Sequence, residues 1–243
     1  EGAKDSPLEG GHGGVPTAKG LIHELQQKPQ IRGLAQNPLL LSLLCSQYQK
    51  GELTFPARRV QIYEQAIHYM LYDWRRVSQR RVTEPTLTDA AWIEAKLDVL
   101  EHLAYQFSCE YKEIFSMREL LTKIEECKSG TALKNHDSPE IIKELAQEDG
   151  IIQQLDGQGR NARYIFLHRT FQEYLTASYL NRQPNGIELA KAHFWDFDWH
   201  ETLILFAGLT DDPELFLNIL LAERDDIFHT LLLLAGKCLA ECP

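Results

Sequence analysis

The chain has 243 residues, of which 25 are Lys or Arg and 35 are Asp or Glu, so its formal net charge is −10. Apolar residues make up 44% and charged residues 25%, a composition that excludes a disordered or collagen-like chain. No run reaches the roughly 18–20 apolar residues of a membrane span, and the polar, glycine-rich start lacks a signal-peptide pattern. The 5 Cys form no CxxC pair, so we expect a reducing, cytoplasmic compartment. Because the chain starts at Glu1 and not at Met, we expect it to be part of a longer product.

The charge is distributed unevenly along the chain. Residues 186–243 carry 11 acidic and 3 basic side chains (−8), whereas residues 1–185 carry 24 and 22 (−2). The acidic end repels phosphate and argues against nucleic-acid binding there. A basic run interrupts the first region, and we interpret it as the solvated end of a helix, with phosphate contact as the alternative. The run consists of Arg75, Arg76, Arg80 and Arg81.

The first quarter of the chain predicts a loop and two helices. Residues 1–20 hold 6 of the 15 Gly and show no apolar period, which indicates a loop. A short helix follows and ends before Pro29. Asn37 is a natural N-cap, and Pro38 suits the first turn of an apolar, buried helix. Gly51 is expected to end that helix.

Apolar residues three and four positions apart predict helices over residues 56–74 and about 89–109, joined by a polar, arginine-rich linker. Ser116 is the expected N-cap of the helix that follows them. A further helix has Pro139 in its first turn and ends at Gly150.

The period then changes from helical to alternating. Residues 151–155 and 163–167 are strand-like and flank the sequence DGQGRN, which predicts a β-hairpin. Helices followed by a two-stranded wing are typical of a winged-helix domain. A helix over 169–181 follows the hairpin, and Pro184 and Gly186 then interrupt the pattern.

Three apolar helical runs close the chain, at about 199–209, 213–222 and 226–241, and each is too apolar to stand alone. Stacked helices of a HEAT-like array bury such faces against one another. The expected fold is therefore mainly α: a winged-helix domain with a small β-hairpin, followed by stacked α-helical repeats.

The sequence contains no complete phosphate loop. In GGVPTAKG, Ala18 precedes Lys19 and Gly20 follows it, whereas the G-x-x-x-x-G-K-[ST] pattern needs Gly before the Lys and Ser or Thr after it. We therefore expect no NTPase site and no catalytic residue in this chain, which on its own is not an enzyme.

A metal site is not predicted either. Cys238 and Cys242 share a helix face, and His193 and His200 lie upstream, but the spacing matches no zinc pattern. Cys is commonly buried, so we expect structural roles for these residues. A Cys–His nucleophilic pair is left open, although nothing in the sequence supports one.

DNA binding would need a basic third helix and wing. The third helix, PEIIKELAQEDG, is acidic, and Arg160 and Arg163 are the only basic residues of the wing. We therefore expect protein contacts in place of nucleic acid.

Two parts of the chain resemble the NACHT branch of the STAND NTPases, bacterial type. LAQNPLLLSLLC (34–45) and PARRVQIYEQAIHYMLYDW (56–74) look like the end of the helical domain that follows the ATPase core, running into the winged helix. YIFLHRTFQEYLTASYL (164–180) is similar to the F-x-H-x-x-F-Q-E-Y-L-x-A signature at the end of the NACHT winged helix. The absence of Walker A and Walker B departs from the family, so hydrolysis is not assigned to this chain: either the ATPase core lies upstream, outside this sequence, or the chain is a degenerate relative.

The resemblance implies three domains. Residues 1–54 would form an N-terminal loop and the end of the NACHT helical domain, 55–185 the winged-helix domain, and 186–243 a truncated HEAT-like region. The upstream NACHT ATPase core in the same protein would be the main partner. Self-association on activation and a role in signalling or antiviral defence are further implications.

The resemblance also implies two nucleotide contacts, which ADP or ATP would make only together with the missing core. Pro38 would pack near the adenine base, and His168 would donate a hydrogen bond to the β-phosphate of ADP. The winged helix would thereby hold a closed, autoinhibited state until nucleotide exchange. Two plainer interpretations stay open: Pro38 as a helix start and His168 as a structural residue at a strand–helix junction. At the level of the whole chain, the alternative is a self-standing winged-helix and helical scaffold that binds protein or DNA.

Overall fold

The computed structural model describes residues 17–50, 54–56, 58–73 and 87–242. The chain divides into two compact units, residues 1–62 and residues 63–243, and α4 (Arg59–His68) begins in the first and ends in the second. Arg75, Arg76, Arg80 and Arg81 lie outside the described residues.

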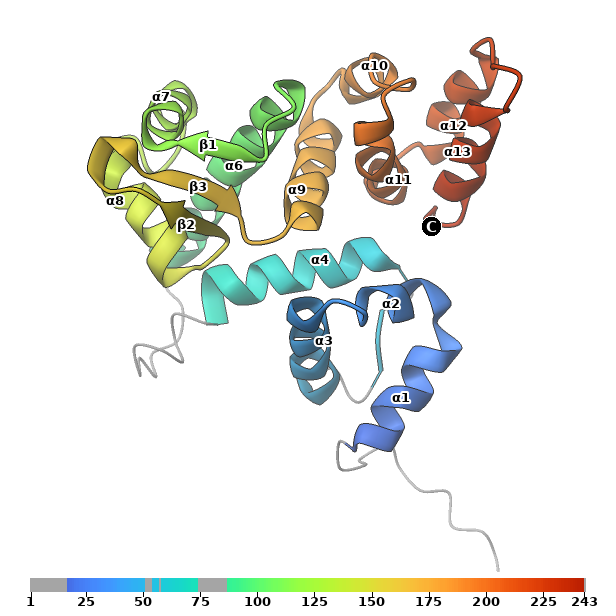
Figure 1. Ribbon diagram of the computed structural model, residues 1–243, viewed down its shortest axis with the longest axis horizontal. Coiled ribbons are helices and arrows are strands. Elements are labelled where there is room, and N and C mark those ends of the chain that lie inside the picture. The colour runs from blue at the N-terminus through green and yellow to red at the C-terminus, as the bar shows by residue number, and fades with distance from the viewer. Residues whose placement is uncertain (1–16, 51–53, 57, 74–86, 243) are drawn as a thin grey trace, which may run out of the picture. The chain divides into compact units, whose positions relative to one another are not determined.

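The first unit contains α1 (Ala18–Gln27), α2 (Pro29–Leu34) and α3 (Pro38–Lys50) (Figure 1). The expectation of a loop through residue 20 is wrong at its end, because the Thr17 hydroxyl accepts a hydrogen bond from Gly20 N at 3.1 Å and starts α1 early. The predicted break at Pro29 is also the first turn of α2, where a proline needs no hydrogen-bond partner. Residues 1–16 and Gly51 lie outside the described residues.

The second unit opens with the end of α4, which passes into a π-helical turn at Tyr69–Asp73. Here Tyr63 packs against Phe171 and Tyr174 of α9 (Arg169–Arg182), with ring centroids 6.3 and 5.7 Å apart. The helix predicted from residue 56 therefore starts three residues later, and Trp74 at its predicted end is outside the described residues.

The middle of the second unit confirms the winged-helix prediction. Its order is α6 (Leu87–Cys109), β1 (Ile114–Ser116), α7 (Met117–Lys128), α8 (Ser138–Lys143), β2 (Ile152–Asp156) and β3 (Arg163–Phe166). The three strands form one antiparallel sheet in the order β1-β3-β2 (Figure 1). The predicted hairpin is the pair β2 and β3. β1 was not predicted, because a strand of three residues is too short to show an alternating pattern. It forms by pairing with β3.

Aromatic packing holds the sheet against α6. Phe107 of α6 stacks on Phe115 of β1 with centroids 4.2 Å apart, and Phe115 meets Phe166 of β3 edge-on at 5.6 Å. All three side chains are buried. Burying an aromatic ring contributes roughly 1.5–3 kcal/mol, so this stack fixes the sheet on which the start of α9 depends.

A capping box and a buried group of ion pairs stabilise the remaining winged-helix elements. Ser116 and Glu119 form a reciprocal capping box that starts α7, as predicted from Ser116. At the end of the third helix, the buried Lys96 of α6 pairs with Asp149 at 2.6 Å and with Glu144 at 2.8 Å. Glu144–Glu148 is a π-helical turn, and Gly150 then reverses the chain with φ +70°.

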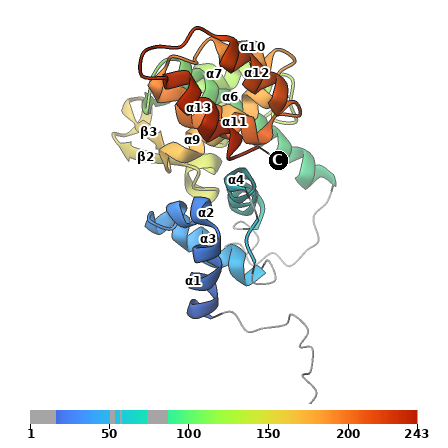
Figure 2. The same cartoon turned by 90° about the vertical axis from the view of Figure 1, so that its right-hand side faces the viewer.

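The C-terminal helices are α10 (Gly186–Lys191), α11 (His200–Leu209), α12 (Pro213–Ala222) and α13 (Thr230–Leu239). α11 packs between α9 and α13, and these three helices form one layer. α10 and α12 contact each other and form a second layer (Figure 2). α10 was not predicted, since its six residues are too few for a periodic signal.

The last helix begins later than the predicted residue 226. Asp226 accepts a hydrogen bond from Thr230 N at 3.0 Å, and Asp225 accepts one from Leu231 N at the same distance. His229 between them is left-handed, with φ +56°, which excludes it from a right-handed helix.

Candidate functional site

His168 lies on the short connection between the end of β3 and the start of α9. Its backbone is extended, and its Nδ1 accepts a hydrogen bond from Thr170 N at 3.2 Å, so the imidazole is the N-cap of α9. The Thr170 hydroxyl lies 2.8 Å from the same nitrogen. A ring nitrogen that accepts an amide hydrogen is unprotonated, so the neutral ring carries its hydrogen on Nε2.

Burial lowers the pKa of His168 below its usual 6.5. Burial therefore favours the neutral form of the ring, which has one N–H group and no positive charge. Its backbone is fixed on both sides, because Leu167 N donates to Ile151 O at 2.7 Å and Phe171 N donates to His168 O at 3.0 Å. The site is thus a positioned, uncharged hydrogen-bond donor on a short connection between a strand and a helix.

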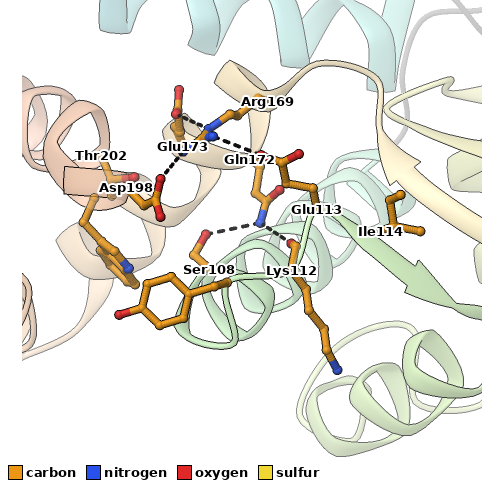
Figure 3. Close-up of a pocket in the computed structure, with 11 residues that line it drawn as sticks. Ser108, Lys112, Glu113, Ile114, Arg169, Gln172, Glu173, Asp198 and Thr202 are labelled. Atoms are coloured by element: carbon orange, nitrogen blue, oxygen red, sulfur yellow. Dashed lines mark hydrogen bonds and ion pairs between the residues drawn. The ribbon is translucent and has the colours of Figure 1, made fainter. Parts of the chain in front are cut away.

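The other polar residues of the FQEYL motif have structural roles. Gln172 is buried, and its amide donates to Ser108 Oγ at 3.3 Å and to Lys112 O at 3.2 Å, which ties α9 to the end of α6 (Figure 3). Glu173 accepts from Arg169 Nε at 2.9 Å. The aromatic residues Phe171 and Tyr174 are buried.

Arg169, next to His168, is a residue that the sequence analysis missed. Besides Glu173 on its own helix, it contacts Glu113 before β1 at 2.9 Å and Asp198 before α11 at 3.2 Å (Figure 3). The signal in the sequence was its position inside the specific HRTFQEYL stretch. Arg169 therefore joins the winged helix to the C-terminal helices through side chains that are distant along the chain.

A pocket of about 400 Å³ opens beside this arginine. Its walls come from the end of α6, the approach to β1, the start of α9 and the start of α11 (Figure 3). His168 is not among the residues that line it.

Pro38 is exposed at the first position of α3. Asn37 Oδ1 accepts from Leu40 N at 3.3 Å, which agrees with the predicted N-cap. The plain interpretation of Pro38 as a helix start therefore holds, and its exposed ring is also available for contact. Pro38 lies in the first compact unit and His168 in the second.

The surface expected to contact DNA in a winged helix is acidic here. On the third helix Glu140 is exposed and Glu144 and Glu148 are partly exposed, whereas Lys143 is its single basic residue. On the wing, Arg163 pairs with Asp156, its Nε lying 2.7 Å from Oδ1. Arg160 is exposed at the tip of the wing. This arrangement does not favour binding to phosphate.

The residues considered for a metal site have other surroundings. Cys238 is buried, and burial raises the pKa of its thiol to about 12. His193 stacks on Trp199 with centroids 3.6 Å apart. Within the described ranges, no group of three His, Cys, Asp or Glu side chains is placed to hold a metal ion. No helix in the same ranges has the length and apolar content that a bilayer crossing requires.

Comparison with known proteins assigns the family. No curated protein matches this chain. The model of the winged helix-turn-helix domain C-terminal to NACHT matches residues 59–180, half of the chain, and spans α4 to α9. This association supports a NACHT-related regulatory role and is consistent with a NACHT core in the same protein. The match agrees with the strand order β1-β3-β2 and with the HRTFQEYL stretch at the start of α9. The chain therefore belongs to the family of winged helix-turn-helix domains that lie C-terminal to NACHT.

Proposed function

We propose that this chain is the regulatory part of a NACHT-type nucleotide switch, in which the winged helix closes over ADP held by a NACHT ATPase core of the same protein. The observation that carries the proposal is the state of His168: Nδ1 is engaged by the helix start, and the hydrogen is on Nε2. A phosphate oxygen accepts hydrogen bonds, so a fixed N–H donor has the chemistry that such a contact needs.

The side chains fit the nucleotide in kind. His168 supplies the donor for the β-phosphate, and the exposed ring of Pro38 supplies an apolar surface for the adenine base. The Mg²⁺ and phosphate-loop groups that support hydrolysis belong to the core. This chain contributes affinity for one nucleotide state and no catalytic group.

Packing within the second unit links the proposed nucleotide contact at His168 to the neighbouring helices. α9 begins at His168 and packs against both α6 and α11, and Arg169 ties its first turn to Asp198. A change at His168 is therefore transmitted to the winged helix and to the C-terminal helices together. Exchange of ADP for ATP would remove the differential contact and favour the open state.

In the open state we propose that the protein self-associates and drives a signalling or defence response in the cytoplasm. The C-terminal helices stack in two layers, as a HEAT-like array would, and present apolar side chains on α12 and α13, among them Leu215, Leu221, Leu232 and Leu233. Exposed apolar groups of this kind mark protein-binding surfaces.

The test separates phosphate contact from helix capping. In the full-length protein, His168→Ala removes both the donor and the N-cap, whereas His168→Asn keeps a capping oxygen and loses Nε2–H. We expect Ala to cost about 1 kcal/mol of stability and Asn only a few tenths. We expect both to release ADP roughly tenfold or more faster, since a hydrogen bond to a charged group contributes about 1.5–3 kcal/mol.

Two readouts make the result decisive: the rate of ADP release and the oligomer size by light scattering. Faster release and a larger oligomer in both variants support the proposal. ADP retention at the wild-type level in His168→Asn, with loss only in His168→Ala, would assign His168 to capping alone and contradict the nucleotide contact.

A further inference from the structure

Three aromatic rings are exposed together where the winged helix meets the C-terminal helices. Trp195 is 47% exposed, Phe197 75% and Tyr111 62%. They line an open hollow of about 540 Å³, together with Asp196 and Asp198, and we call this feature the aromatic hollow. Large apolar side chains gathered on one surface indicate a binding site more often than scattered ones do.

The aromatic hollow is held in shape before any partner arrives. Tyr111 has a left-handed backbone, with φ +55°, a strained conformation for a non-glycine residue that the surrounding contacts must hold in place. Its hydroxyl donates to Asp196 Oδ2 at 2.5 Å. Asp196 Oδ1 in turn accepts from Asp198 N at 3.2 Å. The ring is therefore fixed, and little order has to be gained on binding.

Carboxylates outnumber cations around the aromatic hollow. The hollow adjoins the pocket beside Arg169, since Tyr111 and Asp198 line both. Among the described residues that line the two, Arg169 supplies the guanidinium, which faces Glu113, Glu173 and Asp198. Asp196 also lines the hollow. The Lys112 ammonium points away from the pocket (Figure 3). It pairs with Glu110 and Glu119. The shared wall therefore carries a net negative charge.

We propose that the aromatic hollow binds a segment of a partner protein that presents an arginine side chain. A guanidinium stacks on aromatic faces and pairs with carboxylates through two parallel hydrogen bonds, and the hollow supplies both groups side by side. Phe197 and Asp198 are adjacent in sequence, exposed, and offer the ring and the carboxylate. This site is separate from the nucleotide contact at His168 and does not rest on it.

The test measures binding of fluorescent heptapeptides to the full chain at low salt. The probes carry two arginines flanking a leucine, with the matching lysine and glutamate peptides for comparison. We expect binding in the order Arg, Lys, Glu, weakening as salt is raised. Phe197→Ala and Asp198→Asn should each weaken the arginine peptide roughly tenfold, the effect of about 1.4 kcal/mol.

The matched controls lie on other surfaces. Phe228 is 74% exposed on the loop before α13, and Asp211 is exposed before α12, so Phe228→Ala and Asp211→Asn remove the same groups elsewhere. Both should bind as the wild type does. Arginine-peptide binding that survives Phe197→Ala combined with Asp198→Asn would overturn the proposal. So would equal binding of the glutamate peptide, no binding of the arginine peptide, or free arginine binding as tightly as the peptide.

Discussion

The two ends of α9 each hold an arginine that faces three carboxylates, and the two sets differ in origin. Arg182, at the C-terminal end, contacts Glu94 at 3.0 Å, Asp98 at 2.8 Å and Glu101 at 3.1 Å. All three carboxylates lie on one face of α6, at intervals of about one helical turn. The network at this end therefore locks two helices of one domain together.

The carboxylates around Arg169, at the N-terminal end, come from three separate segments. Glu113 precedes β1, Glu173 is one turn along α9, and Asp198 precedes α11. This network joins the sheet, α9 and the C-terminal helices. The comparison teaches that the same chemistry can fasten one pair of helices at one end and a junction of three segments at the other.

The ends also differ in burial. Glu101 is only 3% exposed, and burial raises the pKa of its carboxyl to about 7, against the opposing effects of Ser178 and Arg182. The carboxylates at the Arg169 end, in contrast, include the well-exposed Glu113 and Asp198. Perturbing the Arg182 end should therefore change stability more than perturbing the Arg169 end.

The largest expected effect is the pH dependence that Glu101 imposes. A carboxyl whose pKa is raised from 4.5 to about 7 contributes its full stability below pH 4.5 and loses it as the pH rises through 7. At 1.36 kcal/mol per pKa unit, titration of Glu101 should lower the free energy of unfolding of the wild type by about 3 kcal/mol as the pH rises through this range. Glu101→Gln should remove that slope, measured by urea unfolding at pH 5 and pH 8. Parallel pH profiles for variant and wild type would show that Glu101 titrates normally.

Removing the cation at the same end should have the next largest effect. Arg182→Met removes the cation that faces Glu101 and keeps the hydrogen bond from the Ser178 hydroxyl to its carboxylate. We expect the free energy of unfolding to fall by about 2 kcal/mol at pH 8. The loss should shrink at pH 5, where Glu101 is protonated. An equal loss at both pH values would contradict a role through the Glu101 charge.

Arg169→Met is the matched variant at the other end and should have the smallest effect. Its ion pairs are partly exposed, so we expect a loss of about 0.2–1 kcal/mol, reduced further by salt. Urea unfolding at low and high salt measures this directly. A loss as large as that of Arg182→Met would mean that the three-segment junction is as important to stability as the helix pair.

The elements that the sequence predicted well depend on neighbours along the chain. The N-cap at Ser116 was predicted from the residue type at the helix start, and the structure completes it with Glu119 three positions later. The hairpin followed from two alternating runs around Gly157 and Gly159, both of which adopt positive φ. Such patterns involve residues that are close together in the sequence, so they can be recognised before the fold is known.

The missed elements depend on partners far along the chain. β1 needs β3, and α10 is too short to show a period. The π-helical turn at Glu144–Glu148 coincides with the buried pairing of Lys96, 48 and 53 positions away from its two carboxylates along the chain. For the candidate site, the resemblance supplied His168, but only the structure assigned its Nδ1 to the helix start.

The sequence by itself determined the helix caps, the hairpin, the acidic character of the third helix and the family motif around His168, because each is set by residue type and local spacing. Tertiary structure alone decided which carboxylates surround Arg169, why the carboxyl of Glu101 has a raised pKa, and that Tyr111 lies beside Asp196, 85 positions later. Those properties depend on burial and on distances between remote segments, and both exist only after the helices have packed.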